Sequence, residues 1–251
     1  MGEFADHFSS AAAEYARFRP RYPSVLFSYL ASLVPEHTLA WDCATGSGQA
    51  AVALAEHFSQ VVATDASPEQ IAHAEPHPRV EYRVATAERS GLSEGSVDLI
   101  TVAQALHWFD LPAFYGEAGR VLRPGGILAV WCYGQMELPS AALQHLIDRF
   151  YSETVGPYWP PERHLVEEGY RSLSFPFVEL PAPAFAMETQ MSMDALLGYL
   201  GTWSATQRCH QATGRDPLPE LMREVAQHWG EPQVRRFVRW PLSLRVGRAG
   251  A

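Results

Sequence analysis

The segment from Leu39 to Asp65 constrains the fold of this chain more strongly than any other part of the sequence. It begins with a short apolar run, L-A-W-D-C, passes through the glycine-bearing turn A-T-G-S-G and a helix-like stretch, and ends in a second apolar run, V-V-A-T-D. A strand, a glycine turn, a helix and a strand ending in an acid form the layout of a nucleotide-cofactor site at the edge of a parallel sheet. The segment therefore predicts an α/β fold with a cofactor at the turn.

Two glycines and one acid carry the chemistry of this turn. Gly46 and Gly48 lack a Cβ, so the backbone can adopt unusual dihedral angles and approach a ligand closely. Asp65 ends the second apolar run, where its carboxylate can accept hydrogen bonds from ribose hydroxyls. A tight turn with an incidental acid is the alternative, but the spacing and the flanking apolar runs favour a ligand site.

Two cofactors compete for the predicted site. From Gly46 the sequence G-S-G-Q-A-A fits the dinucleotide fingerprint G-x-G-x-x-A, with Asp65 about 20 residues further on, which favours NAD. Asp42, at the end of the first apolar run, favours S-adenosylmethionine, because a carboxylate repels a pyrophosphate and attracts ammonium and sulfonium cations. The residues of the turn alone leave both cofactors open.

The order of several motifs makes the chain similar to the class I S-adenosylmethionine-dependent methyltransferases. W-D-C-A-T-G-S-G-Q resembles their first motif, D-x-G-x-G-x-G, with Ala44 at the position of the first glycine. V-E-Y-R-V-A-T-A-E resembles the third motif, S-V-D-L-I-T-V-A-Q-A-L-H-W-F-D resembles the fourth strand with its exit, and R-V-L-R-P-G-G-I-L-A-V-W resembles the next helix, turn and strand. The cofactor-binding residues implied by the resemblance are Arg19, Tyr22, Asp42, Ala44, Gly46, Gly48, Asp65, Thr86, Ala87, Glu88 and Gln104.

Four further segments resemble one branch of this family, which contains trans-aconitate and cantharidin-type small-molecule methyltransferases with a type 11-like domain. They are Y-A-R-F-R-P-R-Y-P near the start, H-W-F-D after the fourth strand, Y-L-G-T-W-S-A near position 200 and W-P-L-S-L-R-V-G-R at the end. The resemblance covers most of the chain and is weak only from about Leu138 to Glu179. It implies S-adenosylmethionine as cofactor, S-adenosylhomocysteine as product and a small-molecule acceptor.

The resemblance also assigns roles to individual residues. Thr86 and Ala87 would contact the adenine, and Gln104 would present its backbone carbonyl to the cofactor's ammonium group, with no role required of its side chain. His107 and Trp108 would leave the fourth strand beside the methyl donor as the catalytic pair. The residues expected to contact the acceptor are Tyr15, Arg19, His107 and Trp203.

The acceptor decides whether a general base is needed. Methyl transfer from a sulfonium is an in-line displacement, and alignment of the two reactants can lower its barrier by roughly 7 to 11 kcal/mol. A carboxylate acceptor is already anionic at neutral pH, whereas a hydroxyl would need a base, for which His107 is the best placed residue. We expect O-methylation of a carboxylate. A C- or N-methyltransferase, an NAD-dependent oxidoreductase and a silent cofactor-binding module remain alternatives.

Composition excludes several classes of protein. The chain has no lysine, since all 19 basic residues are arginine, and pyridoxal-phosphate enzymes, Schiff-base aldolases and Walker A hydrolases all need a lysine amine. A net charge of -9 argues against a nucleic-acid partner. The three cysteines are widely separated, which is typical of reduced thiols, and no metal site is expected. No apolar run reaches the ~20 residues of a membrane span, so we expect a cytoplasmic protein of undetermined oligomeric state.

Alternating apolar runs and helix-like stretches predict a Rossmann-like, seven-stranded, mostly parallel sheet with helices on both faces. We expect one domain over residues 1–251, with a lid (1–23), a cofactor-binding core (24–135), an irregular aromatic and proline-rich substrate cover (136–215) and a C-terminal helix and strand (216–251) that return to the sheet. The predicted strands are Leu39–Cys43, Val61–Thr64, Val80–Val84, Val97–Val102 and Ile127–Tyr133. The predicted helices are Ser24–Leu33, Gln49–His57, Pro68–Ala74, Leu111–Leu122 and Ala141–Tyr151.

Overall fold

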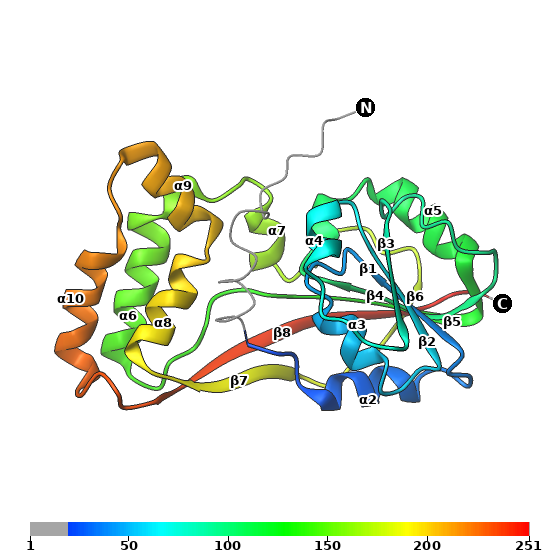
Figure 1. The fold of residues 1–251 in the computed structure, drawn as a ribbon, viewed down its shortest axis with the longest axis horizontal. Coiled ribbons are helices and arrows are strands. Elements are labelled where there is room, and N and C mark those ends of the chain that lie inside the picture. Colours follow the sequence, from blue (N-terminus) through cyan, green and yellow to red (C-terminus); the bar gives the residue numbers. More distant parts are fainter. Residues whose placement is uncertain (1–19, 251) are drawn as a thin grey trace.

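An eight-stranded sheet runs through the part of the chain that the structure, a computed structural model, describes, namely residues 20–250 (Figure 1). Its strands lie in the order β3-β2-β1-β4-β5-β8-β6, and β7 also pairs with β8. The strands are β1 (Leu39–Cys43), β2 (Gln60–Asp65), β3 (Val80–Val84), β4 (Val97–Ala103), β5 (Leu122–Tyr133), β6 (Val178–Leu180), β7 (Phe185–Met191) and β8 (Arg236–Arg248). Strands β1 to β5 are parallel, and β8 is antiparallel to β5.

The predicted Rossmann-like fold is confirmed, and the five parallel strands lie where the apolar runs predicted them. The sheet has eight described strands rather than seven, because β6 and β7 pair with different parts of the same long strand. Strand β5 begins earlier than predicted, since Leu122 pairs with Val97 ahead of a register shift in the ladder. The proline and glycine turn at Pro124 therefore lies within this strand rather than before it.

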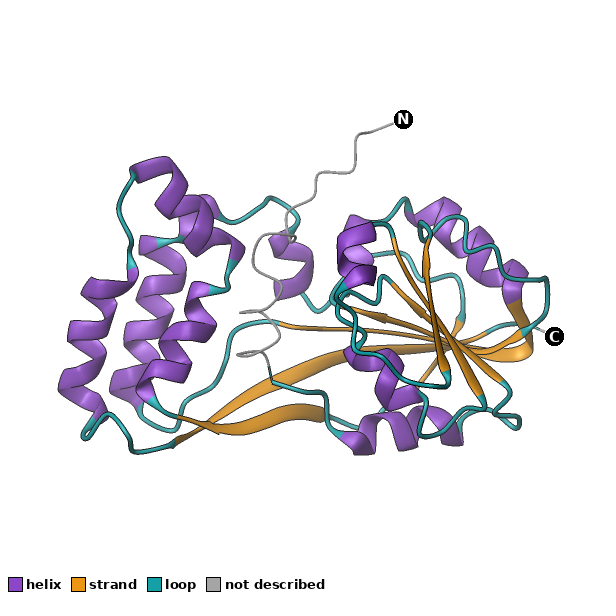
Figure 2. Ribbon diagram, viewed as in Figure 1, coloured by secondary structure: helices purple, strands orange, loops and turns teal. Residues whose placement is uncertain are grey.

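Helices cover both faces of the parallel strands (Figure 2). On β1, Ala40 packs into the cluster that includes α2 (Ser24–Ser32) and α3 (Gln49–Leu54), whereas its neighbour Trp41 packs into the cluster that includes α5 (Leu111–Val121). Neighbouring strand residues point to opposite faces, so both side chains become fully buried in different cores. The short helix α4 (Pro68–Ala72) contacts β2 and β3.

The second half of the chain is more regular than predicted. We expected an irregular cover from the prolines in 138–215, but those prolines lie mostly between regular elements, which leaves the segments between them free to form helices and strands. Besides β6 and β7, the elements here are α6 (Ala141–Arg149), the π-helical turn η3 (Phe150–Thr154), the 3-10 turn η4 (Gly156–Tyr158), α7 (Arg163–Glu167), α8 (Met193–Gly201), α9 (Ser204–Thr213) and α10 (Leu218–Trp229). Helices α6, α8, α9 and α10 form a separate group that β7 and β8 connect to the sheet (Figure 1).

Helix α7 lies between this group of helices and the sheet (Figure 1) and contacts β5. Within residues 20–250, no helix combines the length and the apolar character needed to cross a membrane.

Candidate active site

The turn after β1 has a left-handed backbone at three positions. Ala44, Gly46 and Gly48 have φ angles of 55°, 54° and 82°. This conformation costs a residue with a Cβ roughly 1 to 2 kcal/mol, which explains why glycine suits position 44 in the motif that the turn resembles. At Gly48 a Cβ would also overlap the hydroxyl oxygen of Tyr82, so this position needs glycine for space as well.

Asp42 lies beneath the turn rather than beside an open site. Its carboxylate is 1% exposed and accepts hydrogen bonds from the hydroxyls of Thr45 (2.6 Å) and Thr101 (2.7 Å). Burial raises the pKa of Asp42 to about 6, although both of these hydrogen bonds lower it. The two oxygens of Asp42 are thus held by the protein's own hydroxyls, and its negative charge lies beneath the turn, where it favours a cation.

Asp65 joins the turn to the next helix. At the end of β2, its Oδ2 atom accepts the backbone N–H of Gly46 (2.9 Å), and its Oδ1 atom accepts that of Ser67 (2.9 Å). Ser67 in turn caps α4, where its hydroxyl accepts the N–H of Gln70 (3.3 Å). The acid that the sequence singled out thus aligns the glycine turn with the carboxyl end of β2.

The buried thiol of Cys43 experiences the negative charge around the turn. Burial raises the pKa of Cys43, and the carboxylates of Asp42, Glu88 and Asp65 raise it further. These three acids come from the ends of β1 and β2 and from the connection after β3. Their negative charges therefore act together on the region around the Cys43 thiol. A diphosphate is disfavoured there and a cation is favoured, which fits the sulfonium and ammonium groups of S-adenosylmethionine.

The segment after β3 is tied to its neighbours on both sides. Ala87 is buried and Thr86 is exposed, while Glu88 accepts the backbone N–H of Asp110 (3.2 Å), the residue that caps α5. The structure thus brings this predicted adenine segment to the same edge of the sheet as Asp65, whose backbone carbonyl accepts the N–H of Ala85 (3.0 Å).

Gln104 ends β4 with a φ of 58°. Its side-chain amide donates to the carbonyl of Tyr133 (3.0 Å) and accepts the N–H of the same residue (3.2 Å), so it extends the pairing of β4 with β5. The backbone N–H of Gln104 also donates to the carbonyl of Trp131 (2.9 Å), so the side-chain amide continues the pairing beyond the last backbone bond, a structural role that the resemblance did not require of it.

His107 pairs with a buried tyrosine from the other half of the chain. It lies in the single 3-10 turn η2 (Leu106–Trp108), and its Nδ1 atom is 2.8 Å from the hydroxyl oxygen of Tyr170. Burial raises the pKa of Tyr170 above its usual range, whereas the positive charge of Arg163 lowers it. Among residues 20–250 the Tyr170 hydroxyl has no other hydrogen-bond acceptor, so we assign it as the donor to Nδ1, and the neutral imidazole then carries its own proton on Nε2.

Two effects keep His107 neutral. Burial, and then the positive charge of Arg163, lower the pKa of His107 to about 4. With Nδ1 accepting from Tyr170, the remaining ring nitrogen is a hydrogen-bond donor at neutral pH. Trp108 lies beside it, with ring centroids 4.6 Å apart, and is 39% exposed.

The remaining predicted residues divide into three groups. Tyr22 lies over the end of β5, where its ring meets that of Trp131 edge-on at 5.4 Å, and its N–H donates to Gln49 (3.3 Å). Trp203 is buried in the aromatic cluster of the helical half, 5.5 Å from Trp159. Tyr15 and Arg19 lie outside the described residues.

The sequence did not point to two residues of this site, Arg163 and Tyr170. Both lie in or just after α7, in the stretch that the motifs matched only weakly, and neither belongs to a pattern of known chemistry. Tyr170 is identified by its contact with His107, and Arg163 by the effect of its charge on the pKa of His107.

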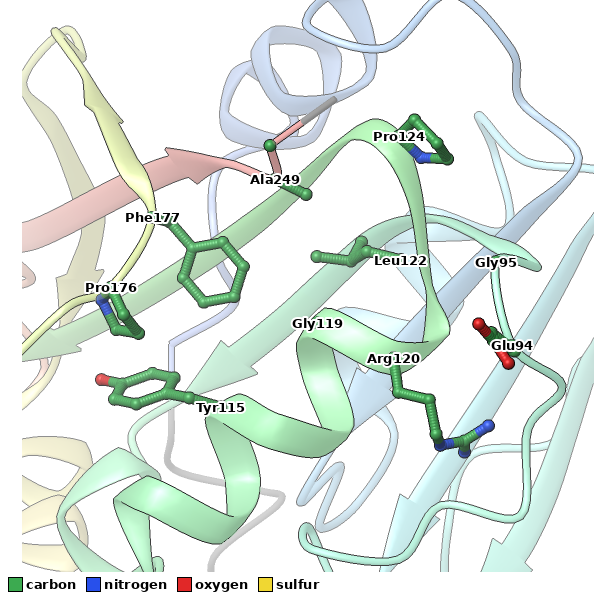
Figure 3. Close-up of a pocket in the computed structure, with 11 residues that line it drawn as sticks. Glu94, Gly95, Tyr115, Gly119, Arg120, Leu122, Pro124, Pro176, Phe177 and Ala249 are labelled. Atoms are coloured by element: carbon green, nitrogen blue, oxygen red, sulfur yellow. The ribbon is translucent and has the colours of Figure 1, made fainter.

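A hollow of about 520 Å³ lies at the opposite end of the sheet, where Tyr115, Leu122 and Phe177 line it (Figure 3). It is formed near the amino ends of β4 and β5. Because open α/β sheets bind ligands beyond the carboxyl ends of their strands, the residues around the glycine turn and His107 form the candidate active site.

Comparisons with known proteins identify the family. A methyltransferase domain model matches residues 41–130. A Dictyostelium discoideum protein named as a methyltransferase is 40% identical over 224 residues, which cover 87% of this chain and 84% of that protein. The solved structure of an Anaeromyxobacter dehalogenans protein named as a type II methyltransferase is 46% identical, with a TM-score of 0.88 over 93% of this chain and 100% of that chain.

A more distant structure shows the same fold with a reaction product bound. It is a Haemonchus contortus phosphoethanolamine N-methyltransferase in complex with S-adenosylhomocysteine, 15% identical, with a TM-score of 0.51 over 97% of this chain and 58% of that chain. The identity with the Dictyostelium protein extends over most of both chains. It favours a methyltransferase over the alternative of an NAD-dependent oxidoreductase. The chain therefore belongs to the class I S-adenosylmethionine-dependent methyltransferases.

Proposed function

We propose that this enzyme transfers a methyl group from S-adenosylmethionine to a carboxylate oxygen of a small acid. The protonation of His107 carries the proposal. A hydroxyl acceptor must lose a proton to a base, but the Nδ1 atom of His107 already accepts from Tyr170, and a pKa of about 4 makes the imidazole a weak base. A carboxylate needs no base, and the Nε2–H group of His107 can donate a hydrogen bond to it.

S-adenosylmethionine supplies a methyl group on a positively charged sulfur, which leaves as a neutral thioether. As the acceptor oxygen forms the new C–O bond, the electron pair of the C–S bond returns to sulfur, so no proton is transferred. The residues of the chain bind and align the two reactants. Alignment and exclusion of water can provide roughly 7 to 11 kcal/mol of barrier lowering.

For the cofactor, Asp65 would accept the ribose hydroxyls, and Thr86 and Ala87 would contact the adenine. The backbone carbonyl of Gln104 would accept the ammonium group, in a field made negative by Asp42 and Glu88. The position of these residues around one glycine turn supports these roles. Arg19 and Tyr22 would close over the cofactor.

For the acceptor, we place the pocket between the carboxyl ends of the strands and residues 136–215, with Trp108 at its wall and Trp203 behind it. Motif similarity to the trans-aconitate and cantharidin-type branch supports a small acid, and the net charge of -9 supports a partner other than nucleic acid. A cytoplasmic location remains a prediction.

An assay of S-adenosylhomocysteine release over a panel of carboxylic acids, each matched with its alcohol and its amine, tests the proposal. We expect turnover with acids only and a methyl ester as product. Asp65→Asn should weaken cofactor binding, whereas Glu69→Gln, an exposed change on α4, should not. Turnover with alcohols or amines but not with acids would overturn the carboxylate assignment, and cofactor binding without any turnover would favour a binding module.

A further inference from the structure

Arg163 is a mostly buried cation at the start of α7. Its side chain is 18% exposed, and its Nε atom donates to the hydroxyl of Tyr151 (2.8 Å). The guanidinium carbon lies 4.7 Å from the ring centroid of Trp159 and 5.5 Å from that of Tyr151. Two aromatic rings and one hydroxyl therefore hold the planar group in a single orientation.

The hydrogen-bonding capacity of this guanidinium is only partly used. Glu167 approaches its Nε atom at 4.0 Å, but this carboxylate also bonds the Tyr151 hydroxyl and its side chain is 47% exposed. Among residues 20–250, no side chain or carbonyl accepts a hydrogen bond from the two terminal nitrogens of Arg163. A mostly buried charge with two open donor nitrogens is costly to the fold, and the open edge matches a carboxylate.

The charge of Arg163 acts on the groups at the reaction centre. It lowers the pKa of His107, after burial, and it also lowers the pKa values of Tyr170 and Cys132 against the larger effect of burial. These groups belong to η2, to the turn after α7 and to the end of β5. The geometry agrees, because α7, which begins at Arg163, contacts β5, and Tyr170 just after this helix lies against His107.

An aromatic wall supports the arginine. The rings of Tyr151, Trp159 and Trp203 lie 5.0 to 5.6 Å apart in each pair. Tyr151 belongs to the π-helical turn η3, and such turns are rare and often occur at functional sites. The three rings are inclined to one another by 39° to 88° and form an apolar wall with one fixed cation at its edge.

We propose that Arg163 binds a second anionic group of the acceptor, one that is not methylated, so that the enzyme selects small acids with two acidic groups. This inference rests on the proposed function. A guanidinium paired with the reacting carboxylate would draw electron density from both of its oxygens, whereas the neutral Nε2–H of His107 orients that carboxylate at less cost to its nucleophilicity. The cation is thus better used on a carboxylate away from the methyl donor.

Matched pairs of acids test the inference. Succinate, fumarate and isophthalate would each be compared with the monoamide, which keeps the size and one carboxylate but loses the second charge. We expect kcat/KM of the wild type to be about 10- to 100-fold higher for the diacid, the value of a charge-assisted hydrogen bond. Arg163→Gln should remove this preference mainly through KM, and Arg163→Lys should restore only part of it.

Two controls separate binding from folding. Affinity for S-adenosylhomocysteine, measured by calorimetry, should be the same in Arg163→Gln and the wild type, because Arg163 lies outside the cofactor residues. Arg171→Gln removes the same charge from an exposed position beyond α7 and should keep the preference for diacids. Calorimetric binding of the diacids to the S-adenosylhomocysteine complex reports on Arg163 even where turnover is slow.

The outcomes are distinguishable. If the wild type methylates acids but does not favour diacids, or if Arg163→Gln keeps the preference, the role of Arg163 is wrong while the proposed function stands. If the wild type methylates only alcohols or amines, the proposed function fails and this inference fails with it.

Discussion

The Nδ1 atom of His107 lies 2.8 Å from the hydroxyl oxygen of Tyr170, a fully buried residue that follows α7. This contact connects the exit of β4, where the methyl donor is expected, to the segment between the sheet and the group of helices. It assigns the imidazole proton to Nε2, and in this way it determines whether the histidine donates or accepts a hydrogen bond.

Tyr170→Phe removes the hydroxyl that fixes this tautomer. We expect the free energy of unfolding to fall by about 1 kcal/mol, the net value of one hydrogen bond, and kcat on an acid to fall with little change in KM for the cofactor. Chemical denaturation and steady-state kinetics measure the two effects. Tyr158→Phe, on a half-buried tyrosine of η4, is the matched control. An unchanged kcat in Tyr170→Phe would show that the tautomer is irrelevant to catalysis.

His107 should make stability, rather than activity, depend on pH. Its pKa is about 4 in the folded state and about 6.5 in the unfolded state, so the unfolded chain binds more protons between these values. The contribution of His107 is therefore present above pH 6.5 and is lost as the pH falls towards 4, by on the order of 2 to 3 kcal/mol. Denaturation of the wild type and His107→Gln from pH 4 to 7 should show their difference shrinking with acid.

The same pKa predicts that kcat on an acid shows no inflection between about pH 5.5 and 8 from this residue. A clear inflection near pH 6.5 that disappears in His107→Gln would contradict the assignment and would favour a general base.

Ala44→Gly should stabilise the enzyme. Ala44 has a φ of 55°, a conformation that glycine adopts without steric cost, so the free energy of unfolding should rise by up to about 1 kcal/mol after the larger chain entropy of glycine is included. Thermal and chemical unfolding measure this change. Gly48→Ala is the converse variant, because both its φ of 82° and the nearby Tyr82 hydroxyl oppose a Cβ. Equal stability of Ala44→Gly and the wild type would show that the turn relaxes at this position.

Asp42 should make the folded protein less stable as the pH rises, whereas His107 has the opposite effect. Asp42→Asn should remove the contribution of Asp42. The folded pKa of about 6 is above the unfolded value of 3.8, so the buried carboxylate contributes most below pH 3.8, and this contribution is lost as the pH rises through 6. The loss is on the order of 3 kcal/mol. The difference in unfolding free energy between wild type and Asp42→Asn should move in favour of the variant from pH 4 to 7. Parallel curves would mean that Asp42 titrates alike in both states.

Local patterns in the sequence determined the parallel sheet and the cofactor turn. Strands β1 and β3 have the predicted bounds, and the glycines and acids at Gly46, Gly48 and Asp65 lie together at the carboxyl ends of β1 and β2. Such features depend on hydrophobic periodicity and on backbone angles that a few neighbouring residues dictate, so a single stretch of sequence contains the information. The prediction of irregular structure from the prolines of the second half was wrong. These prolines lie mostly at the boundaries of helices and strands, and they do not determine how those elements pack.

Only the tertiary structure brought together the residues that we propose for the acceptor side of the site. His107, Tyr170 and Arg163 come from a turn after β4 and from the region of α7, and no motif links them along the chain. The burial of Asp42 and the neutral state of His107 also follow from packing, since a pKa shift requires the surrounding low-dielectric core and the charges that folding brings near. The sequence alone therefore predicted the fold and, through the resemblance of its motifs, the cofactor class, while the distances by which we propose that the enzyme selects an acceptor exist only after distant segments have packed together.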